Sequence, residues 1–310
     1  MVEKKRHHFV LVHGCCHGGW SWYKVASLLR GAGHEVRPLD LRASGIDAAT
    51  PDQVSSFADY NQPLVDLLES LPAHEGVVLV GHSFGGLSIA SAAERFPTKV
   101  AVAVFVTAAM PNPKLPPSML LHNVSPLSPS ASSCLCSLMV FLHFRCPTGL
   151  LMHSYFLIPF ISLLLMRHGI LSKERIESWE DSSLVAHTDT SRLLPATIEF
   201  GTQFMRSRLY NNCSVEDYTL ATMLKRAAPF DRDDLSCHDF VSEINYGRTK
   251  RVYVVCKDDQ VIKESFQRWM IEVGQVDDVM EIKGADHMPM FSKPHDLCNL
   301  LLQIADTHSS

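Results

Sequence analysis

The sequence lacks an excess of positive charge. It has 28 lysine and arginine residues against 33 aspartate and glutamate residues, a formal net charge of −5, and no basic block beyond "KKR" at residues 4–6. Binding to nucleic acid depends largely on clustered lysine and arginine that neutralise phosphates. The composition therefore gives no support for a nucleic-acid partner and favours small, neutral or mildly acidic ligands.

The sequence also lacks an uninterrupted apolar run long enough to cross a membrane and cysteines spaced as metal ligands. The first apolar run, "FVLV" at residues 9–12, is too short for a secretory signal, so we interpret it as a buried strand. The nine cysteines include the adjacent Cys15 and Cys16, and Cys134 and Cys136 with one residue between them. Neither arrangement resembles the paired ligands of a zinc site. We expect free thiols in a reducing compartment, a cytoplasmic location and no metal site.

What the sequence does have is an alternation of short, valine-rich runs with longer stretches of helical apolar spacing. The runs that we expect to be strands span residues 8–12, 35–41, 76–81, 99–109, 251–256 and 278–284. Such an alternation is typical of a parallel sheet covered on both faces. The 310 residues, 46% of them apolar, can bury a core of this size. We predict an α/β fold with one doubly wound sheet formed by residues 1–111 and 248–310.

Residues 112–247 interrupt this pattern, and we expect them to form a mainly helical cap over the carboxyl edge of the sheet. Within them, residues 124–172 join a Ser/Pro-rich tract to a very apolar run without helical or strand periodicity. Charged, histidine and proline residues break this run, so no apolar span reaches the ~20 residues of a transmembrane helix. We interpret residues 124–172 as an atypical insertion.

The pentapeptide "GHSFG" at residues 81–85 is a G-x-S-x-G match in a specific context. A valine-rich strand ends at Gly81, and a helical stretch begins at Phe84. A serine on so sharp a strand-to-helix turn needs small neighbours, and the turn exposes its hydroxyl above the sheet. The turn has neither a G-x-G-x-x-G pattern nor a Walker lysine, which argues against a phosphate loop. Ser83 is therefore the candidate nucleophile.

A serine hydroxyl needs a histidine base and an acid that orients the base. In sheets of this kind the chain order is serine, acid, histidine, and the partners lie in loops after strands. The last strand is followed by "ADH", so His287 is the candidate base. The strand before it is followed by "KDDQ", where Asp258 and Asp259 are nearly equal candidates for the acid.

Acyl transfer also needs backbone donors for the developing oxyanion. One is the N–H group of Phe84, directly after the nucleophile. The loop "HGCCHGGW" at residues 13–20 follows the first strand, and its glycines let the backbone approach a substrate closely. We nominate the N–H group of Cys15 as the second donor. We expect no role for the thiol, because Ser83 has the better turn for a nucleophile.

Together these segments resemble the plant methylesterase family of α/β-hydrolases, which includes salicylate-binding esterases and is related to the hydroxynitrile lyases. The similarity is carried by "FVLVHGCCHGGWSW", "VVLVGHSFGG", "KRVYVVCKDDQ" and "VMEIKGADHMPM", and it covers the chain except residues 124 to about 170. The resemblance implies the α/β-hydrolase fold, a triad of Ser83, Asp259 and His287, oxyanion donors at Cys15 and Phe84, and no cofactor.

The resemblance also implies a pocket and a reaction. Trp179 and Phe200 match aromatic pocket walls of the family's cap. The lyases carry threonine or asparagine where this chain has Gly14, and many carry lysine where it has Met288. Both positions are therefore in the esterase state. We expect a serine carboxylesterase that hydrolyses methyl esters of small plant hormone acids of the jasmonate, salicylate or indole-acetate type.

Two other functions stay open, namely low-turnover binding of a small hormone acid in the same pocket, and hydroxynitrile lyase activity. The expected partner is a small-molecule ester, without nucleic acid or membrane, and a homodimer is the candidate assembly. Because the family has no counterpart of residues 124–172, our hypothesis is that they are a retained intron or a mispredicted gene segment. Finding them in the sequenced mature transcript would contradict this hypothesis.

Overall fold

The computed structural model describes residues 5–72, 75–114, 117, 120, 180–185, 196–230, 235 and 240–309. The chain divides into two units, Met1–Val124 together with Asp181–Ser310, and Ser125–Glu180. The helices and strands described below all belong to the first unit. The expected insertion at residues 124–172 and the predicted pocket residue Trp179 lie outside the described residues. Among the described residues, no helix combines the length and the apolar character needed to cross a membrane.

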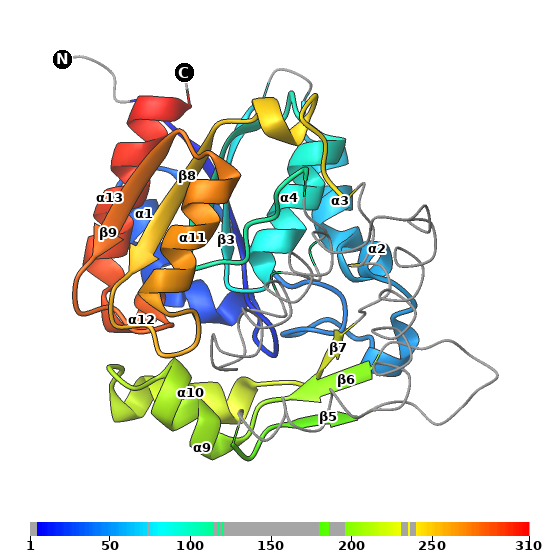
Figure 1. Cartoon of the computed structure of the whole chain (residues 1–310), viewed down its shortest axis with the longest axis vertical. Helices are drawn as coiled ribbons and strands as arrows, with labels where there is room; N and C mark the ends of the chain where they lie inside the picture. The colour runs from blue at the N-terminus through cyan, green and yellow to red at the C-terminus, as the bar shows by residue number, and fades with distance from the viewer. Residues whose placement is uncertain are drawn as a thin grey trace, which may run out of the picture. The chain divides into compact units, whose positions relative to one another are not determined.

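Six parallel strands form the main sheet, in the order β2-β1-β3-β4-β8-β9 (Figure 1). They are β1 (His8–Val12), β2 (Glu35–Leu39), β3 (Val77–His82), β4 (Val100–Val106), β8 (Arg251–Cys256) and β9 (Asp278–Ile282). β1, β3 and β8 are buried along their whole length, as strands covered on both faces must be. The predicted parallel sheet is confirmed. β4 ends earlier than the expected residue 109, because Thr107 leaves the extended conformation with a φ of 35°.

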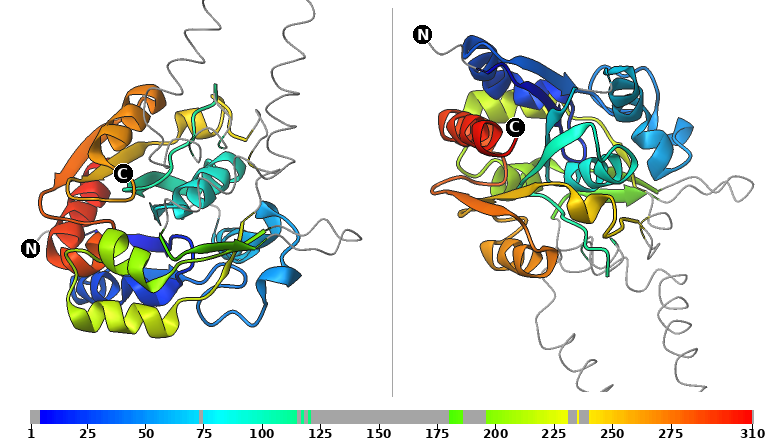
Figure 2. Two further views of the ribbon diagram at one scale, coloured as in Figure 1. Left: turned by 60° about the horizontal axis from the view of Figure 1, so that its bottom comes forward. Right: turned by 90° about the horizontal axis from the view of Figure 1, so that it is seen from above.

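Helices cover both faces of this sheet (Figure 2). α1 (Tyr23–Gly31) and α13 (Pro294–His308) pack against each other on one face, while α4 (Gly85–Arg95) and α11 (Glu264–Gly274) lie on the other. In α13 the buried residues Leu297, Leu301 and Ile304 recur at helical spacing, so one stripe of the helix faces the core. The other helices outside the cap are shorter than α4, α11 and α13: η1 (Gly19–Trp22), η2 (Pro51–Gln53), α2 (Phe57–Tyr60), α3 (Gln62–Ser70) and α12 (Pro289–Ser292). The short helix η6 (Tyr246–Arg248) directly precedes β8.

The segment between β4 and β8 contains a second, smaller sheet. Its antiparallel strands are β5 (Ser183–Val185), β6 (Ala196–Glu199) and β7 (Ala228–Phe230), and its helices are α9 (Thr202–Phe204), the π-helix η4 (Met205–Leu209) and α10 (Val215–Leu224). The hydroxyl of Ser214 accepts the N–H of Asp217 and so caps the start of α10. These elements lie beyond the carboxyl ends of the main strands (Figure 1). We call the described part of this segment (residues 180–185, 196–230, 235 and 240–250) the cap.

The winding of the sheet changes direction between the neighbouring strands β1 and β3. The chain leaves β1 toward α1 on one face and leaves β3 toward α4 on the other. Diverging connections of this kind open a crevice outside the carboxyl ends of the two strands, where open α/β sheets bind their ligands. The fold therefore brings the loop at residues 13–20 next to the turn that carries Ser83.

Candidate active site

Ser83 occupies the turn between β3 and α4, and its backbone is left-handed. Its φ is 54°, a region that residues with a side chain rarely adopt. Hydrogen bonds hold the turn in this conformation, because the carbonyl of Ser83 accepts the N–H groups of Gly86 at 3.1 Å and of Ala109 at 2.9 Å. The strained turn projects the Ser83 side chain above the carboxyl edge of the sheet.

The two glycines of the G-x-S-x-G motif have a steric explanation. A Cβ atom at Gly81 would lie 2.7 Å from the carbonyl oxygen of Gly85, and a Cβ atom at Gly85 would lie 2.5 Å from the carbonyl oxygen of His13. Backbone atoms cannot yield to such contacts without moving the strands themselves. Only glycine at both positions lets β1, β3 and α4 approach closely enough to form the turn.

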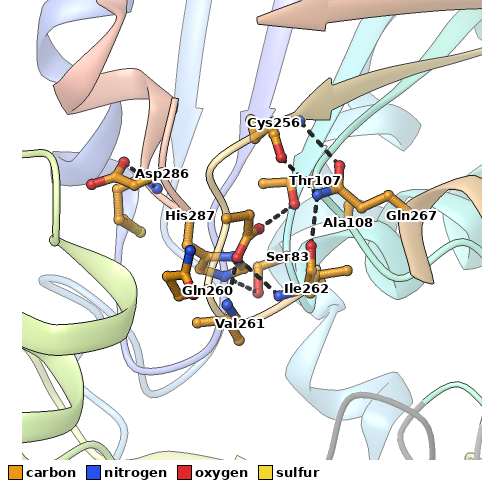
Figure 3. A network of polar contacts seen from close by, with 12 residues as sticks. Ser83, Thr107, Ala108, Cys256, Gln260, Val261, Ile262, Gln267, Asp286 and His287 are labelled. Carbon is orange, nitrogen blue, oxygen red and sulfur yellow. Dashed lines mark hydrogen bonds and ion pairs between the residues drawn. The ribbon is translucent and has the colours of Figure 1, made fainter. Parts of the chain in front are cut away.

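His287 lies in the loop after β9, where its ring contacts Ser83 (Figure 3) and the carboxylate of Asp259. Its Nδ1 is 2.7 Å from Oδ2 of Asp259, and its Nε2 is 2.9 Å from Oγ of Ser83. A carboxylate only accepts hydrogen bonds, so Nδ1 carries the proton and Nε2 is left to accept the serine O–H. The side chain of His287 is 1% exposed and that of Asp259 is 0% exposed, so water is largely excluded from this chain of hydrogen bonds.

The environments of the two neighbouring aspartates differ. Oδ1 of Asp259 accepts the N–H groups of Val261 at 2.6 Å and Ile262 at 2.9 Å, while its Oδ2 accepts the hydroxyl of Thr107 in addition to His287. The side chain of Asp258 is exposed to solvent. The geometry thus brings Asp259, and not Asp258, to the histidine, in agreement with the position implied by the family resemblance.

The loop after β1 presents Cys15 between two fixed peptide groups. Leu41 N–H donates to Nε2 of His13 at 3.1 Å, so Nδ1 of His13 carries the proton and donates to the carbonyl of Gly14 at 2.8 Å. Burial lowers the pKa of His13, which keeps the ring neutral as these bonds require. Because the peptide group is planar, fixing the Gly14 carbonyl also fixes the direction of the Cys15 N–H. The N–H group of Phe84 lies at the start of α4, where the helix dipole favours negative charge.

The Cys15 thiol has the wrong protonation state for a nucleophile. Its Sγ lies 3.8 Å from Sγ of Cys16, and this contact together with burial raises the pKa of Cys15 well above its usual range. A thiol reacts through its thiolate, which this environment disfavours. All five cysteines in the described residues are free and buried: Cys15, Cys16, Cys213, Cys256 and Cys298.

Of the residues expected to shape the pocket, Gly14 and Met288 lie next to the catalytic residues, whereas Phe200 lies in the cap. A Cβ atom at Gly14 would lie 2.9 Å from Cβ of Ser83, so this position borders the nucleophile directly. Met288 follows His287 and is fully buried. Phe200 lies after β6 in the cap, and its ring packs against Phe204 with 5.2 Å between centroids. The role of Phe200 as a pocket wall stays a prediction.

One group of described side chains has the composition of a metal site. His8, Glu35 and Glu75 place one possible ligand atom each within 4.8 Å of one another. They lie at the amino ends of the strands, on the edge of the sheet opposite Ser83. Glu35 pairs with Arg37 at 3.2 Å, and Glu75 pairs with His8 at 2.6 Å. An ion pair of Glu35 and a hydrogen bond of Glu75 therefore account for the two carboxylates, and the group takes no part in the chemistry at Ser83.

Some contributors to the site were missed in the sequence. Thr107 follows β4 and binds the carboxylate of Asp259. Asp286 is fully buried beside His287 and accepts the N–H of Met288 at 3.0 Å. The letters "ADH" contained a signal for Asp286, because a carboxylate directly before the candidate base was visible there. Thr107 gave no such signal.

Comparison with known proteins gives a consistent result over almost the whole chain. A model described as "Alpha/beta hydrolase family" matches residues 9–300. Methylesterase 2 of Arabidopsis thaliana is 41% identical over 307 residues, covering 98% of this chain and 98% of that protein. Methyl jasmonate esterase 1 of Vitis vinifera is 39% identical over 309 residues, covering 99% and 100%. The crystal structure of polyneuridine aldehyde esterase superposes with a TM-score of 0.78 at 35% identity, covering 97% of this chain and all of that one.

Proposed function

The chain belongs to the alpha/beta hydrolase family and to its plant methylesterase group, and we propose that it is a serine carboxylesterase that hydrolyses methyl esters of small acids. The observation that carries this proposal is the hydrogen-bonded chain from Ser83 through His287 to Asp259, with links of 2.9 and 2.7 Å. A serine, an imidazole and a carboxylate at these distances are the minimal machinery for acyl transfer.

The first half-reaction is acylation of the serine. Ser83 Oγ attacks the ester carbonyl while Nε2 of His287 takes the hydroxyl proton. Asp259 holds the imidazole in the required tautomer and stabilises the imidazolium without itself taking the proton. The N–H groups of Cys15 and Phe84 stabilise the oxyanion, and His287 then donates its proton to the departing methanol.

The second half-reaction returns the enzyme to its starting state. Nε2 of His287, neutral again, takes a proton from water, which attacks the acyl carbonyl while the same N–H groups hold the oxyanion. The acid product leaves, and Ser83 regains its proton from His287. Every proton movement is thus assigned to Ser83, His287 or water, so the reaction needs no metal or organic cofactor.

The substrate class rests on similarity and on the apolar character of the site. One relative is named a methyl jasmonate esterase, which supports hydrolysis of jasmonate-type methyl esters, with salicylate and indole-acetate esters as the other candidates. Met288 is buried and uncharged beside His287, and suits the hydrocarbon part of such an acid. The free cysteines of the described residues fit a reducing, cytoplasmic location.

A panel of methyl esters tests the proposal. Methyl jasmonate, methyl salicylate and methyl indole-acetate are incubated with the wild-type protein and with Ser83→Ala, and the released acid is quantified. We expect turnover of at least one ester by the wild type and a loss of about 10⁴-fold or more in the variant. Saturable binding of the free acid without hydrolysis of any ester, followed by calorimetry, would contradict the esterase assignment and favour a binding protein.

A further inference from the structure

One turn of the cap contacts both loops that carry the proposed catalytic groups. This turn, which we call the cap turn, comprises residues 210–213, between η4 and α10. Its first residue, Tyr210, reaches His17 in the loop after β1. Its later residues, Asn212 and Cys213, reach Asp286 in the loop after β9. These are contacts between residues 193, 74 and 73 positions apart in the sequence, so they depend on the cap being seated on the core.

The first contact ends on the peptide group next to the oxyanion donor. Nδ1 of His17 lies 2.7 Å from the carbonyl of Cys15, which only accepts, so this nitrogen carries the proton. Nε2 of His17 is then an acceptor, and the hydroxyl of Tyr210 donates to it at 2.6 Å. Burial lowers the pKa of His17 to about 4, which keeps the ring neutral and this bond pattern intact near neutral pH.

Cys15 is consequently held from both sides. The peptide group before it is fixed by His13 through the Gly14 carbonyl, and the peptide group after it is fixed by His17 through the Cys15 carbonyl. The core supplies the fixed donor for the first imidazole, at Leu41, whereas the cap supplies it for the second, at Tyr210. The direction of the Cys15 N–H thus depends in part on a hydroxyl that belongs to the cap.

The second contact ends on the loop of the base. Oδ2 of Asp286 accepts the N–H of Asn212 at 2.8 Å and the thiol of Cys213 at 3.2 Å. Its Oδ1 accepts the N–H of Met288 at 3.0 Å and the hydroxyl of Ser292 at 2.7 Å. His287 lies between Asp286 and Met288, and Figure 3 shows Asp286 directed away from Ser83. One buried carboxylate therefore ties the backbone around His287 to the cap turn.

Ring packing connects the same three segments. The Tyr210 ring stacks on His17 with 5.9 Å between centroids, and lies 5.6 Å from Phe291 of α12, the helix that follows His287. Trp20, from the loop after β1, also stacks on His17, with 5.5 Å between centroids. The cap turn is therefore packed against both loops as well as hydrogen-bonded to them.

We infer that Tyr210, in the cap turn, and Asp286, which binds the cap turn, are positioning residues of the proposed esterase reaction. Through them a single cap turn holds both the oxyanion donor at Cys15 and the base His287. The inference rests on the proposed function. Donors preorganised for the oxyanion act only when they are aimed within tenths of an ångström of the reacting atom. Because the cap turn contacts both the loop that carries Cys15 and the loop that carries His287, it fixes the two loops relative to one another.

Tyr210→Phe tests the first half of this inference and keeps the ring packing. Its matched control is Tyr218→Phe, which removes a cap hydroxyl that donates to the Thr202 carbonyl away from the catalytic loops. We expect kcat per titrated active site with nitrophenyl acetate to fall about tenfold in Tyr210→Phe, with KM within about twofold of the wild type. Affinity for a trifluoromethyl ketone, which forms a tetrahedral adduct, should fall by a similar factor, while affinity for the free acid product should not.

A merely structural role gives a different result. It would lower the melting temperature and the fraction of titratable sites, but kcat per site and the affinity for the tetrahedral adduct would stay at wild-type values. That result in Tyr210→Phe overturns the inference. If neither the wild type nor Tyr218→Phe hydrolyses an ester, the proposed function itself is contradicted. Failure of the inference and failure of the proposed function are therefore distinguishable.

Asp286→Asn tests the second half, with the exposed Asp258→Asn as its matched control. The amide keeps the shape of the side chain, but its NH₂ group cannot accept hydrogen bonds, so it cannot satisfy all four groups that donate to Asp286. We expect kcat per titrated site to fall about tenfold or more in Asp286→Asn and to stay within about twofold in Asp258→Asn. Equal kcat per site in the two variants overturns the assignment of Asp286.

Discussion

Replacing Asp259 with asparagine should reverse the tautomer of His287. Two backbone N–H groups, of Val261 and Ile262, point at Oδ1 of Asp259 at 2.6 and 2.9 Å. In the variant the amide oxygen must stay on that side, because an NH₂ group there would face two donors. The NH₂ group is thereby forced toward Nδ1 of His287. Nδ1 must then accept, and the proton moves to Nε2.

The consequence for Ser83 follows from the 2.9 Å contact between Oγ and Nε2 of His287. A protonated Nε2 cannot take the serine proton, so the general base is lost while the geometry is kept. Loss of the base through a wrong tautomer lowers kcat by ~10⁴, which corresponds to about 5.5 kcal/mol of transition-state stabilisation. Residual activity reflects the oxyanion donors and substrate binding.

The assay is steady-state hydrolysis of nitrophenyl acetate by Asp259→Asn, by the wild type and by Asp258→Asn, with folding checked by circular dichroism. Because Asp258 is exposed, its variant should retain activity within about twofold. Retention of more than a tenth of wild-type kcat by a folded Asp259→Asn would refute the tautomer argument. An equal loss in Asp258→Asn would refute the choice of acid.

Three further changes have defined outcomes. Gly14→Ala should lower kcat/KM by at least about tenfold, because the new Cβ would lie 2.9 Å from Cβ of Ser83. The control Gly31→Ala, with no atom within 4 Å of its new Cβ, should have kcat/KM near that of the wild type. Equal kcat/KM values in the two variants would contradict the steric argument. Cys15→Ala should keep activity within about threefold, since only its backbone N–H is used, and a loss as large as that of Ser83→Ala would indicate thiol chemistry. The free energy of unfolding, from urea titrations, should fall as the pH is lowered from about 6.5 toward 4. The pKa of His17 is about 4 in the folded state against 6.5 normally, so over this range the unfolded chain binds a proton that the folded chain does not. The free energy of unfolding should therefore be lower by about 2 kcal/mol at pH 5. A free energy of unfolding that is constant or rises over this range would contradict the buried, neutral imidazole.

The sheet and the serine turn could be predicted because their signals are local. Six valine-rich runs identified the strands, and "GHSFG" between a strand and a helix fixed the place of Ser83. The position of His287 followed from the rule that parallel strands deliver their loops to one edge. Such features need only the sequence within a few residues and the topology of the sheet.

Contacts that join distant segments could not be predicted in this way. Asp258 and Asp259 are adjacent in the sequence. In the structure the burial of Asp259 and its hydrogen bonds with Thr107, His287 and residues 261 and 262 distinguish it from Asp258. Tyr210 and His17 are 193 positions apart, and no periodicity relates them. β4 ends early because Thr107 has a positive φ, which the run of apolar residues in the sequence did not predict.

Covalent labelling with a fluorophosphonate decides whether Ser83 is a nucleophile activated by His287. We expect one adduct, mapped by mass spectrometry to the peptide that contains Ser83. It should be absent in Ser83→Ala and form at least about 10³-fold more slowly in His287→Ala. An adduct on another residue, or undiminished labelling of Ser83→Ala, would contradict this role of Ser83.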